Sequence, residues 1–173
     1  MCSSDLMAIK VGDKLPAGKL WELPVEWSAG CPTAADEIDV TAATKGKRIV
    51  IFALPGAYTR TCSAAHLPGY VQDADKIKAK KVDEVWCLSV NDAMVMAAWG
   101  RDNKAGGKVR MMGDGSALFT KALGLETDLT ARGMGVRSQR YSMLVEDGVV
   151  KALNLEAPGK FEVSGADKML AQL

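Results

Sequence analysis

The sequence has little of what metal, membrane and nucleic-acid sites require. Its 173 residues include one histidine and four cysteines, and no two cysteines form a Cys-x-x-Cys pair. A zinc site needs several such ligands at close spacing, so none is expected. The chain also lacks a run of about 18 apolar residues, so no transmembrane helix is expected. The net charge is only +1, which gives no indication of a nucleic-acid or membrane partner.

Length and composition are those of a single globular domain. With 48% hydrophobic and 25% charged residues, a chain of this size can bury a core without disulfides or metals. Residues 1–8 lack the apolar stretch of a signal peptide and are predicted to be a disordered extension. Residues 9–173 are predicted to form the domain. With no export signal, we expect thiols in a reducing compartment and a cytoplasmic protein.

One segment places a cysteine at the exit of a buried strand. Residues 48–54 are apolar and β-branched, which predicts a strand of a parallel or mixed sheet, and Pro55-Gly56 ends it. Apolar residues then recur at helical spacing, which predicts a helix over 62–80. Thr59 and Thr61 stand where this helix would be capped. Cys62 is therefore expected in or beside the first helical turn.

This position favours a reactive thiol. The unpaired amides and the positive end of the helix dipole stabilise a thiolate, which can lower a cysteine pKa from about 8.5 to between roughly 3.5 and 7.5. The alternative is a small buried hydrophobic residue with no chemistry. Thr59 stands where thioredoxins carry the first cysteine of a Cys-x-x-Cys pair. A hydroxyl there can form hydrogen bonds but no disulfide, so attack by a lone thiolate is predicted.

The remaining cysteines and the histidine are less informative. Cys2 lies in the predicted extension, and Cys31 lies in a turn-rich connection where a redox role stays open. Cys87 falls in an apolar run over 84–90 and is expected in the core. His66 lies one helical turn beyond Cys62. For His66 a structural role or a dimer contact is favoured over general-base catalysis.

The order of predicted elements is that of a thioredoxin-like α/β sandwich with an N-terminal strand or hairpin extension. After the extension at 19–28, the first strand and helix are followed by a second strand, a helix capped by Asn91-Asp92, and a third strand. A short helix, a loop, a hairpin turning at Asp147-Gly148 and a final helix complete the chain. The later strands are predicted over 84–90 and 109–112, and the short helix over 118–123, closed by Gly124. The loop spans 126–139, and the hairpin strands span 141–145 and 149–154. Ser164 opens the last helix.

The sequence resembles the peroxiredoxins, specifically the type II, peroxiredoxin-5-like branch. The family motif Pro-x-x-x-Thr-x-x-Cys stands here as Pro55, Thr59 and Cys62. The resemblance continues through most of the chain, from about residue 9 to residue 173. Further matching segments are Cys62–Tyr70, Cys87–Asp92, Trp99-Gly100, Asp114-Gly115, Phe119–Gly124 and Arg137–Met143.

The resemblance implies a thiol peroxidase acting on hydrogen peroxide and small organic (alkyl) hydroperoxides. Cys62 would attack a peroxide oxygen and become a sulfenic acid. Thr59 would hydrogen-bond the thiolate and the peroxide, and Pro55 would limit solvent access to the sulfur. Arg140 matches the family arginine before the Tyr-Ser-Met strand and would stabilise the thiolate and the developing charge. From the residues alone, nothing distinguishes Arg140 from the nearby Arg132 and Arg137.

Two departures from the family pattern concern Arg60 and recycling. Many members have proline where this chain has Arg60, which could lower the pKa of Cys62, bind an anionic reductant or face solvent. Some relatives carry a resolving cysteine near the C-terminal helix, where this chain has Phe161–Ser164. The resemblance therefore implies a one-cysteine enzyme without a cofactor, reduced by an external thiol. Glutathione with glutaredoxin is favoured, and thioredoxin stays open. A homodimer is expected.

Two other functions remain open on the sequence. Without a resolving cysteine, a Cys62 sulfenic acid could form a mixed disulfide with a partner protein, which would make the chain a peroxide sensor. An unreactive Cys62 would instead leave a silent scaffold with a thioredoxin-like surface.

Overall fold

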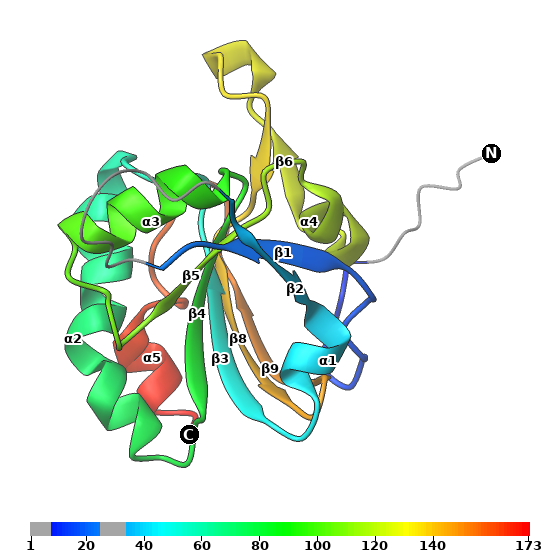
Figure 1. Cartoon of the computed structure of the whole chain (residues 1–173), viewed down its shortest axis with the longest axis vertical. Coiled ribbons are helices and arrows are strands. Elements are labelled where there is room, and N and C mark those ends of the chain that lie inside the picture. Colours follow the sequence, from blue (N-terminus) through cyan, green and yellow to red (C-terminus); the bar gives the residue numbers. More distant parts are fainter. Residues whose placement is uncertain (1–7, 25–33) are drawn as a thin grey trace.

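The computed structural model describes residues 8–24 and 34–173, and within them a seven-stranded mixed sheet forms the centre of the molecule (Figure 1). The strand order is β2-β1-β5-β4-β3-β8-β9. The strands are β1 (Lys19–Glu22), β2 (Asp36–Asp39), β3 (Arg48–Ala53), β4 (Glu84–Ser89), β5 (Arg110–Gly113), β8 (Tyr141–Glu146) and β9 (Val149–Leu155). Strands β3, β4 and β5 are parallel, and β1, β8 and β9 pair antiparallel with their neighbours. The predicted thioredoxin-like α/β fold is confirmed.

Helices cover both faces of this sheet. They are α1 (Val40–Thr44), α2 (Leu67–Lys78), α3 (Ala93–Asp102), α4 (Leu118–Leu123) and α5 (Ala166–Leu170). One core cluster joins α2, α3 and α5 to the sheet, and a second joins α1 and α4 to the opposite face. Side chains alternate between faces along a strand, so Val50 and Phe52 pack in the first cluster while Ile49 and Ile51 pack in the second. The continuous apolar run of β3 follows from this burial on both faces.

Strand β3 ends where the sequence predicts, and its register fixes what lies beside that end. It pairs in parallel with β4 and antiparallel with β8, where Ala53 is opposite Tyr141. The amide of Leu54 makes one more bond to the Leu88 carbonyl, at 3.3 Å. Pro55 then has no amide to continue the ladder. The residues after β3 therefore lie close to the residues that precede β8.

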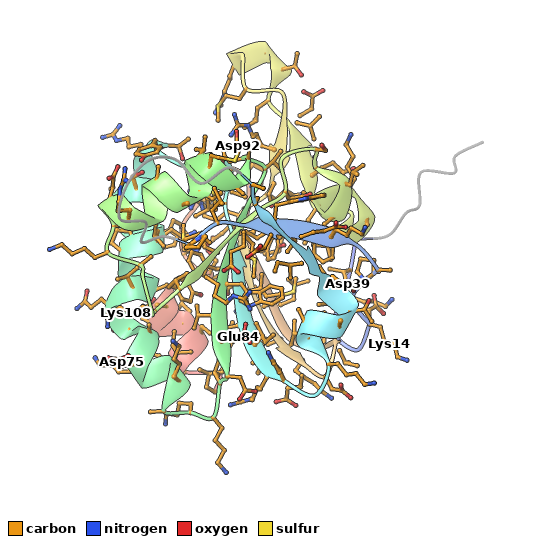
Figure 2. All side chains as sticks on the ribbon, in the orientation of Figure 1. Lys14, Asp39, Asp75, Glu84, Asp92 and Lys108 are labelled. Atoms are coloured by element: carbon orange, nitrogen blue, oxygen red, sulfur yellow. The ribbon has the colours of Figure 1, made fainter. Side chains whose placement is uncertain are left out.

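Several predicted boundaries are confirmed. The carboxylate of Asp92 accepts a hydrogen bond from the Val95 amide at 2.8 Å and so caps α3; Figure 2 labels it at the start of that helix. Gly124 closes α4 with a φ of 72°. The β8–β9 hairpin turns at Asp147 and Gly148, whose φ values of 48° and 77° are those of an Asp-Gly hairpin turn.

The segment 126–139 differs from the predicted loop. It contains two short paired strands, β6 (Glu126–Asp128) and β7 (Val136–Ser138), with a 3₁₀ turn, η2 (Thr130–Arg132), between them. This two-stranded arm projects from the body of the molecule beside α4 (Figure 1). Strands of three residues are too short for a recognisable alternation of apolar and polar residues, so backbone pairing alone defines them.

The helix predicted over 62–80 has an irregular start. It begins with a π-helical turn, η1 (Cys62–His66), and continues as α2. Pro68 stands in the first turn of α2 and has no amide to donate to the preceding turn. The π-helical spacing is thus a local adjustment of the hydrogen-bond ladder, as is common in single π-helical turns.

The N-terminal part was only partly predicted. Strand β1 is an internal strand of the main sheet, between β2 and β5, and not an arm over the domain. Val25 and Trp27 of the predicted arm, Cys2, Cys31 and residues 1–7 of the predicted extension lie outside the described residues. Strand β2 was not predicted, because its residues are mostly charged and exposed at the sheet edge.

Candidate active site

The segment that carries Cys62 crosses from the end of β3 to η1. The backbone is already helical at Arg60, and Cys62 is the first residue of η1, while the side chain of Cys62 lies outside what the structure describes. The hydroxyl of the next residue, Ser63, accepts a hydrogen bond from Trp99 Nε1 of α3 at 2.9 Å. The predicted strand–turn–helix setting of Cys62 is therefore present, with its first turn attached to α3.

The turn after β3 is held by the neighbouring strand. Asn91 Oδ1 accepts hydrogen bonds from the Ala57 amide at 2.9 Å and from Ser89 Oγ at 2.7 Å. Sequence reasoning treated Asn91 as part of a helix cap. The structure assigns the cap to Asp92 alone and gives Asn91 the different task of fixing the turn that leads to Cys62.

Thr59 holds the same turn from within. Its Oγ1 donates to the Gly56 carbonyl at 2.7 Å, and its own carbonyl accepts from the Ser63 amide at 2.9 Å. The hydroxyl proton of Thr59 is thus engaged by Gly56, and capping of the helix by its oxygen stays a prediction. A hydroxyl has one proton and two lone pairs. With its proton engaged, Thr59 keeps lone pairs that can accept a hydrogen bond.

Replacing Thr59 by valine is expected to slow the reaction of the protein with hydrogen peroxide by about tenfold to a hundredfold, because a precisely placed acceptor and the turn bond are both lost. Thr59→Ser keeps the hydroxyl and is the matched control, with most of the rate retained. Stopped-flow fluorescence on the reduced protein measures both. Equal rates for the valine and serine variants would contradict a role for the hydroxyl.

A second side chain reaches this turn, and sequence reasoning did not select it. Arg137, in β7 of the two-stranded arm, donates from Nη1 to the Pro55 carbonyl at 3.3 Å and from Nε to the Met134 carbonyl at 2.8 Å. A Cβ at Gly56 would lie 2.7 Å from Arg137 Nη1. The turn and the guanidinium are therefore in close contact, and Pro55 meets Arg137 through its carbonyl.

Arg140 lies at the far end of the turn that Cys62 begins. Its Nη1 is 2.8 Å from Nδ1 of His66, the last residue of η1, and its Cζ is 5.8 Å from the centre of the Phe161 ring. Arg140 thus contacts the helical turn that begins at Cys62 by way of His66. Arg137 instead contacts the Pro55–Gly56 turn that precedes Cys62. Arg132 belongs to η2 in the projecting arm.

His66 is enclosed on all sides. It is 0% exposed, which excludes the predicted alternative of a dimer contact. Burial, and then the neighbouring Arg140 charge, lower the pKa of His66 to about 3. The imidazole is therefore neutral at physiological pH, and with so low a pKa it is a weak base for a proton transfer.

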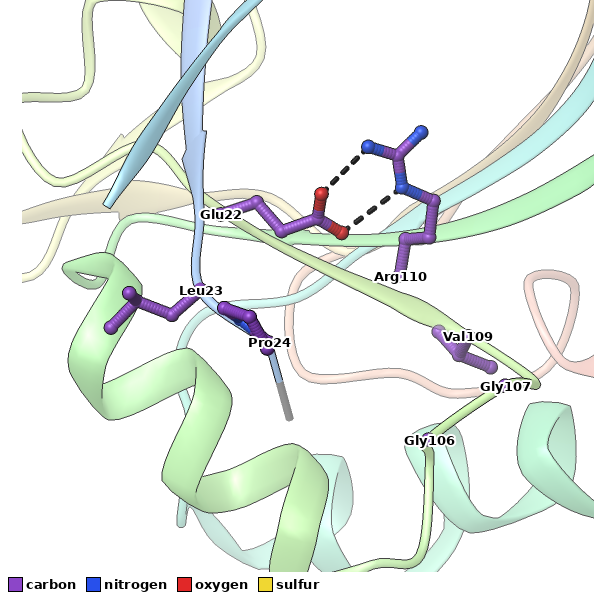
Figure 3. Close-up of a pocket in the computed structure, with 7 residues that line it drawn as sticks. All are labelled: Glu22, Leu23, Pro24, Gly106, Gly107, Val109 and Arg110. Carbon is purple, nitrogen blue, oxygen red and sulfur yellow. Dashed lines mark hydrogen bonds and ion pairs between the residues drawn. The ribbon is translucent and has the colours of Figure 1, made fainter. Parts of the chain in front are cut away.

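A pocket lies away from this site. A pocket of about 340 Å³ opens at the beginning of β5, beside Gly106 and Gly107. Arg110 pairs there with both carboxylate oxygens of Glu22, at 2.6 and 3.0 Å (Figure 3). Because β3 and β5 belong to one parallel set, the start of β5 and the end of β3 are at opposite ends of the strands. This pocket is separate from the Cys62 segment.

The described residues carry no group of three or more metal-ligating side chains that could hold an ion. Across residues 8–24 and 34–173, no helix has the length and apolar character needed to cross a bilayer.

Comparison with known proteins identifies the family. Residues 10–170 match the Redoxin family. A chloroplastic peroxiredoxin-2E of Arabidopsis thaliana is 45% identical over 170 residues, which cover 96% of this chain and 70% of the relative. A peroxiredoxin-2C of Oryza sativa subsp. japonica is 40% identical, with 95% and 98% covered. The chain belongs to the type II peroxiredoxins. This peroxiredoxin is accordingly a thiol-dependent peroxidase that reduces peroxides.

Solved structures agree with that assignment. Reduced Prx3 of Vibrio vulnificus in complex with hydrogen peroxide is 48% identical to this peroxiredoxin, with a TM-score of 0.87 and coverage of 95% and 98% of the two chains. A chain from Burkholderia cenocepacia, described as a putative thioredoxin reductase, is 57% identical with a TM-score of 0.91 and coverage of 96% and 98%. It shares the fold of this peroxiredoxin.

Proposed function

We propose that Cys62 is the residue that reacts with hydrogen peroxide and small organic hydroperoxides, and that an external thiol, glutathione acting with glutaredoxin, restores it. The observation that carries this proposal is the placement of Cys62 at the start of η1, between the Thr59 turn and the Arg140–His66 pair. The Vibrio vulnificus relative that binds hydrogen peroxide supports the substrate.

The chemistry is a two-electron oxidation of sulfur. The Cys62 thiolate attacks one peroxide oxygen, an S–O bond forms, and the O–O bond breaks. The departing hydroxide or alkoxide takes a proton and leaves as water or alcohol, and Cys62 becomes a sulfenic acid. One external thiol then displaces water to form a mixed disulfide, and a second thiol releases Cys62 as a thiol together with an external disulfide.

The neighbouring residues have distinct parts in this step. Thr59 accepts a hydrogen bond from the peroxide O–H and holds the oxygen in line with the sulfur. Arg140 stabilises the thiolate and the charge that develops on the departing oxygen. Pro55 limits the access of water to the sulfur, and its carbonyl is held by Arg137. No cofactor takes part.

The structure supports an external reductant. Cys87 is 0% exposed in β4, where it lies opposite Phe52 on one side and Met111 on the other. We expect this buried thiol to stay reduced, since an external partner cannot reach it. Residues 161–164 contain no cysteine. An external thiol is therefore the expected reductant of Cys62.

The reductant is tested by peroxide-dependent NADPH consumption in two parallel assays, one with glutathione, glutaredoxin and glutathione reductase, the other with thioredoxin and thioredoxin reductase. We expect turnover in the glutathione assay. Turnover with thioredoxin alone would overturn the reductant assignment and direct attention to Cys31, with Cys31→Ser as the next variant. Oxidation of Cys62 by peroxide without turnover in either assay would favour the sensor function, with a mixed disulfide to a partner protein.

Assembly and location stay predictions. The homodimer rests on the family resemblance. Curated relatives include chloroplastic and mitochondrial proteins as well as proteins whose names give no compartment, so the cytoplasmic location rests on the sequence alone.

A further inference from the structure

The imidazole of His66 joins two parts of the chain that are far apart in sequence. On one side its Nδ1 is 2.8 Å from Arg140 Nη1, and on the other its Nε2 is 3.1 Å from the Ser164 carbonyl. The ring is also packed between aromatic rings, with centroids 5.1 Å from Phe52 and 4.9 Å from Phe161. Its orientation is thus fixed by two polar contacts and by packing.

The Ser164 side of this contact is itself firmly held. Sequence reasoning expected Ser164 to cap the last helix, but α5 has Gly165 at its N-cap with no side-chain bond. The amide and the hydroxyl of Ser164 both donate instead to Glu156 Oε2, at 2.8 and 2.7 Å. The Ser164 carbonyl also accepts from the Tyr70 hydroxyl at 2.8 Å. Ser164 is therefore a fixed acceptor for His66.

Glu156, which holds Ser164, also binds the backbone of Arg140. The Glu156 carboxylate also accepts hydrogen bonds from the amides of Glu162 and Val163, and the Glu156 amide donates to the Arg140 carbonyl at 3.0 Å. A closed ring of hydrogen bonds thus runs from the Arg140 side chain through His66, Ser164 and Glu156 to the Arg140 backbone. Both ends of this arginine are fixed by one connected group.

The hydrogen-bond directions follow from the partners. The Ser164 carbonyl can only accept, so Nε2 carries the imidazole proton, and a guanidinium can only donate, so Nδ1 must accept. The neutral ring satisfies both, in agreement with a pKa lowered to about 3, first by burial and then by Arg140. A neutral acceptor holds a guanidinium and leaves its positive charge intact. A carboxylate in the same place would offset that charge.

We propose that His66 is a positioning residue of the peroxidase reaction, because its Nδ1 lone pair fixes the direction of the Arg140 guanidinium beside the helical turn that begins at Cys62. This inference rests on the proposed role of Arg140. His66 takes no proton and does not touch the reacting oxygen. Its contribution is to keep the arginine in one orientation with its full charge available to the site.

The tautomer is the most direct test and does not depend on activity. His66 is the single histidine of the chain, so long-range ¹H–¹⁵N spectra of untagged protein contain one imidazole. We expect a protonated Nε2 and an unprotonated Nδ1, unchanged between about pH 5 and pH 9 because the pKa is about 3. A protonated Nδ1, or an imidazolium at neutral pH, would overturn the proposal.

Three variants separate positioning from packing. The amide of His66→Asn can place an acceptor near the Nδ1 position, His66→Gln can place a donor near the Nε2 position, and His66→Phe keeps the ring without either nitrogen. We expect His66→Phe and His66→Gln to lower the peroxide rate constant by about tenfold or more, since small displacements of a catalytic group have effects of this size. His66→Asn should recover most of that loss. Equal losses in Asn and Gln would exclude the positioning role.

A double-mutant cycle identifies Arg140 as the residue through which His66 acts. In an Arg140→Gln background, His66→Phe should cause little further loss of rate, because the orientation it controls no longer exists. Losses that multiply independently would overturn the proposal even if each variant folds. A wild-type protein that fails to react with peroxide would instead contradict the proposed function, and the ring tautomer would then stand as a separate result.

Discussion

Replacing Cys62 by serine is expected to lower peroxide turnover by on the order of 10³-fold or more, because a serine hydroxyl at this position has neither the low pKa nor the nucleophilicity of a thiolate. The fold should be retained, since the change removes no backbone contact of η1. Turnover is measured as NADPH consumption with the full reducing system, and the first half-reaction as the fluorescence change of the reduced protein on mixing with peroxide. Trp99 is a suitable reporter because its indole contacts Ser63, next to Cys62.

Matched cysteine variants make this test specific. Cys87→Ala removes a thiol that is buried in β4 and should leave the peroxide rate near that of the wild type while lowering thermal stability, as loss of a buried side chain does. Cys31→Ser should likewise retain turnover in the glutathione assay. Undiminished turnover in Cys62→Ser, or loss of turnover in Cys87→Ala without unfolding, would contradict the assignment of Cys62.

The second large effect is expected at Arg140. Arg140→Gln should lower the rate constant with peroxide by about 10²-fold, since removal of one charge-stabilising donor in a preorganised site has effects of this order. The thiol pKa of Cys62, read from the pH dependence of alkylation, should rise at the same time. Arg140→Lys should recover the charge but not the planar fork, and therefore only part of the rate.

Arg137 is the internal control for this prediction. It also lies at the Cys62 segment, but it contacts the Pro55 carbonyl and is fixed by the Met134 carbonyl of its own arm. Arg137→Gln should therefore have a smaller effect on the alkylation pKa than Arg140→Gln. The reverse order would assign the charge-stabilising role to Arg137, which sequence reasoning could not separate from Arg140 without the family resemblance.

The fold was largely predictable because its strongest signals are local. The apolar runs of β3 and β4, the Asp92 cap, the Gly124 stop and the Asp147-Gly148 turn each act within a few residues, and the structure confirms them. Strand β2 and the β6–β7 arm were not predicted. Their residues are polar or their strands too short, so they are defined only by backbone pairing with an adjacent strand.

The contacts of the candidate site residues were not predictable from the sequence. Sequence and resemblance selected Thr59, Cys62 and Arg140, yet the hydroxyl of Thr59 bonds Gly56 and the guanidinium of Arg140 bonds His66. His66 and Ser164 are 98 residues apart in the chain. A contact over that distance is decided by how strands and helices pack, and no pattern within one segment of the sequence reports it.

The pairing of Tyr141 with Ala53 determines which insertions in the chain would alter the site. Arg140 stands one step before that rung of the ladder, and Pro55 two steps after it, so one antiparallel strand pair brings together residues that are remote in sequence. Chain length added in the surface connection between α3 and β5 would not alter this alignment. A single-residue insertion within β3 or β8 would turn the following side chains to the opposite face. The distance between the Cys62 segment and Arg140 is thus set by strand register and is independent of the length of chain between them.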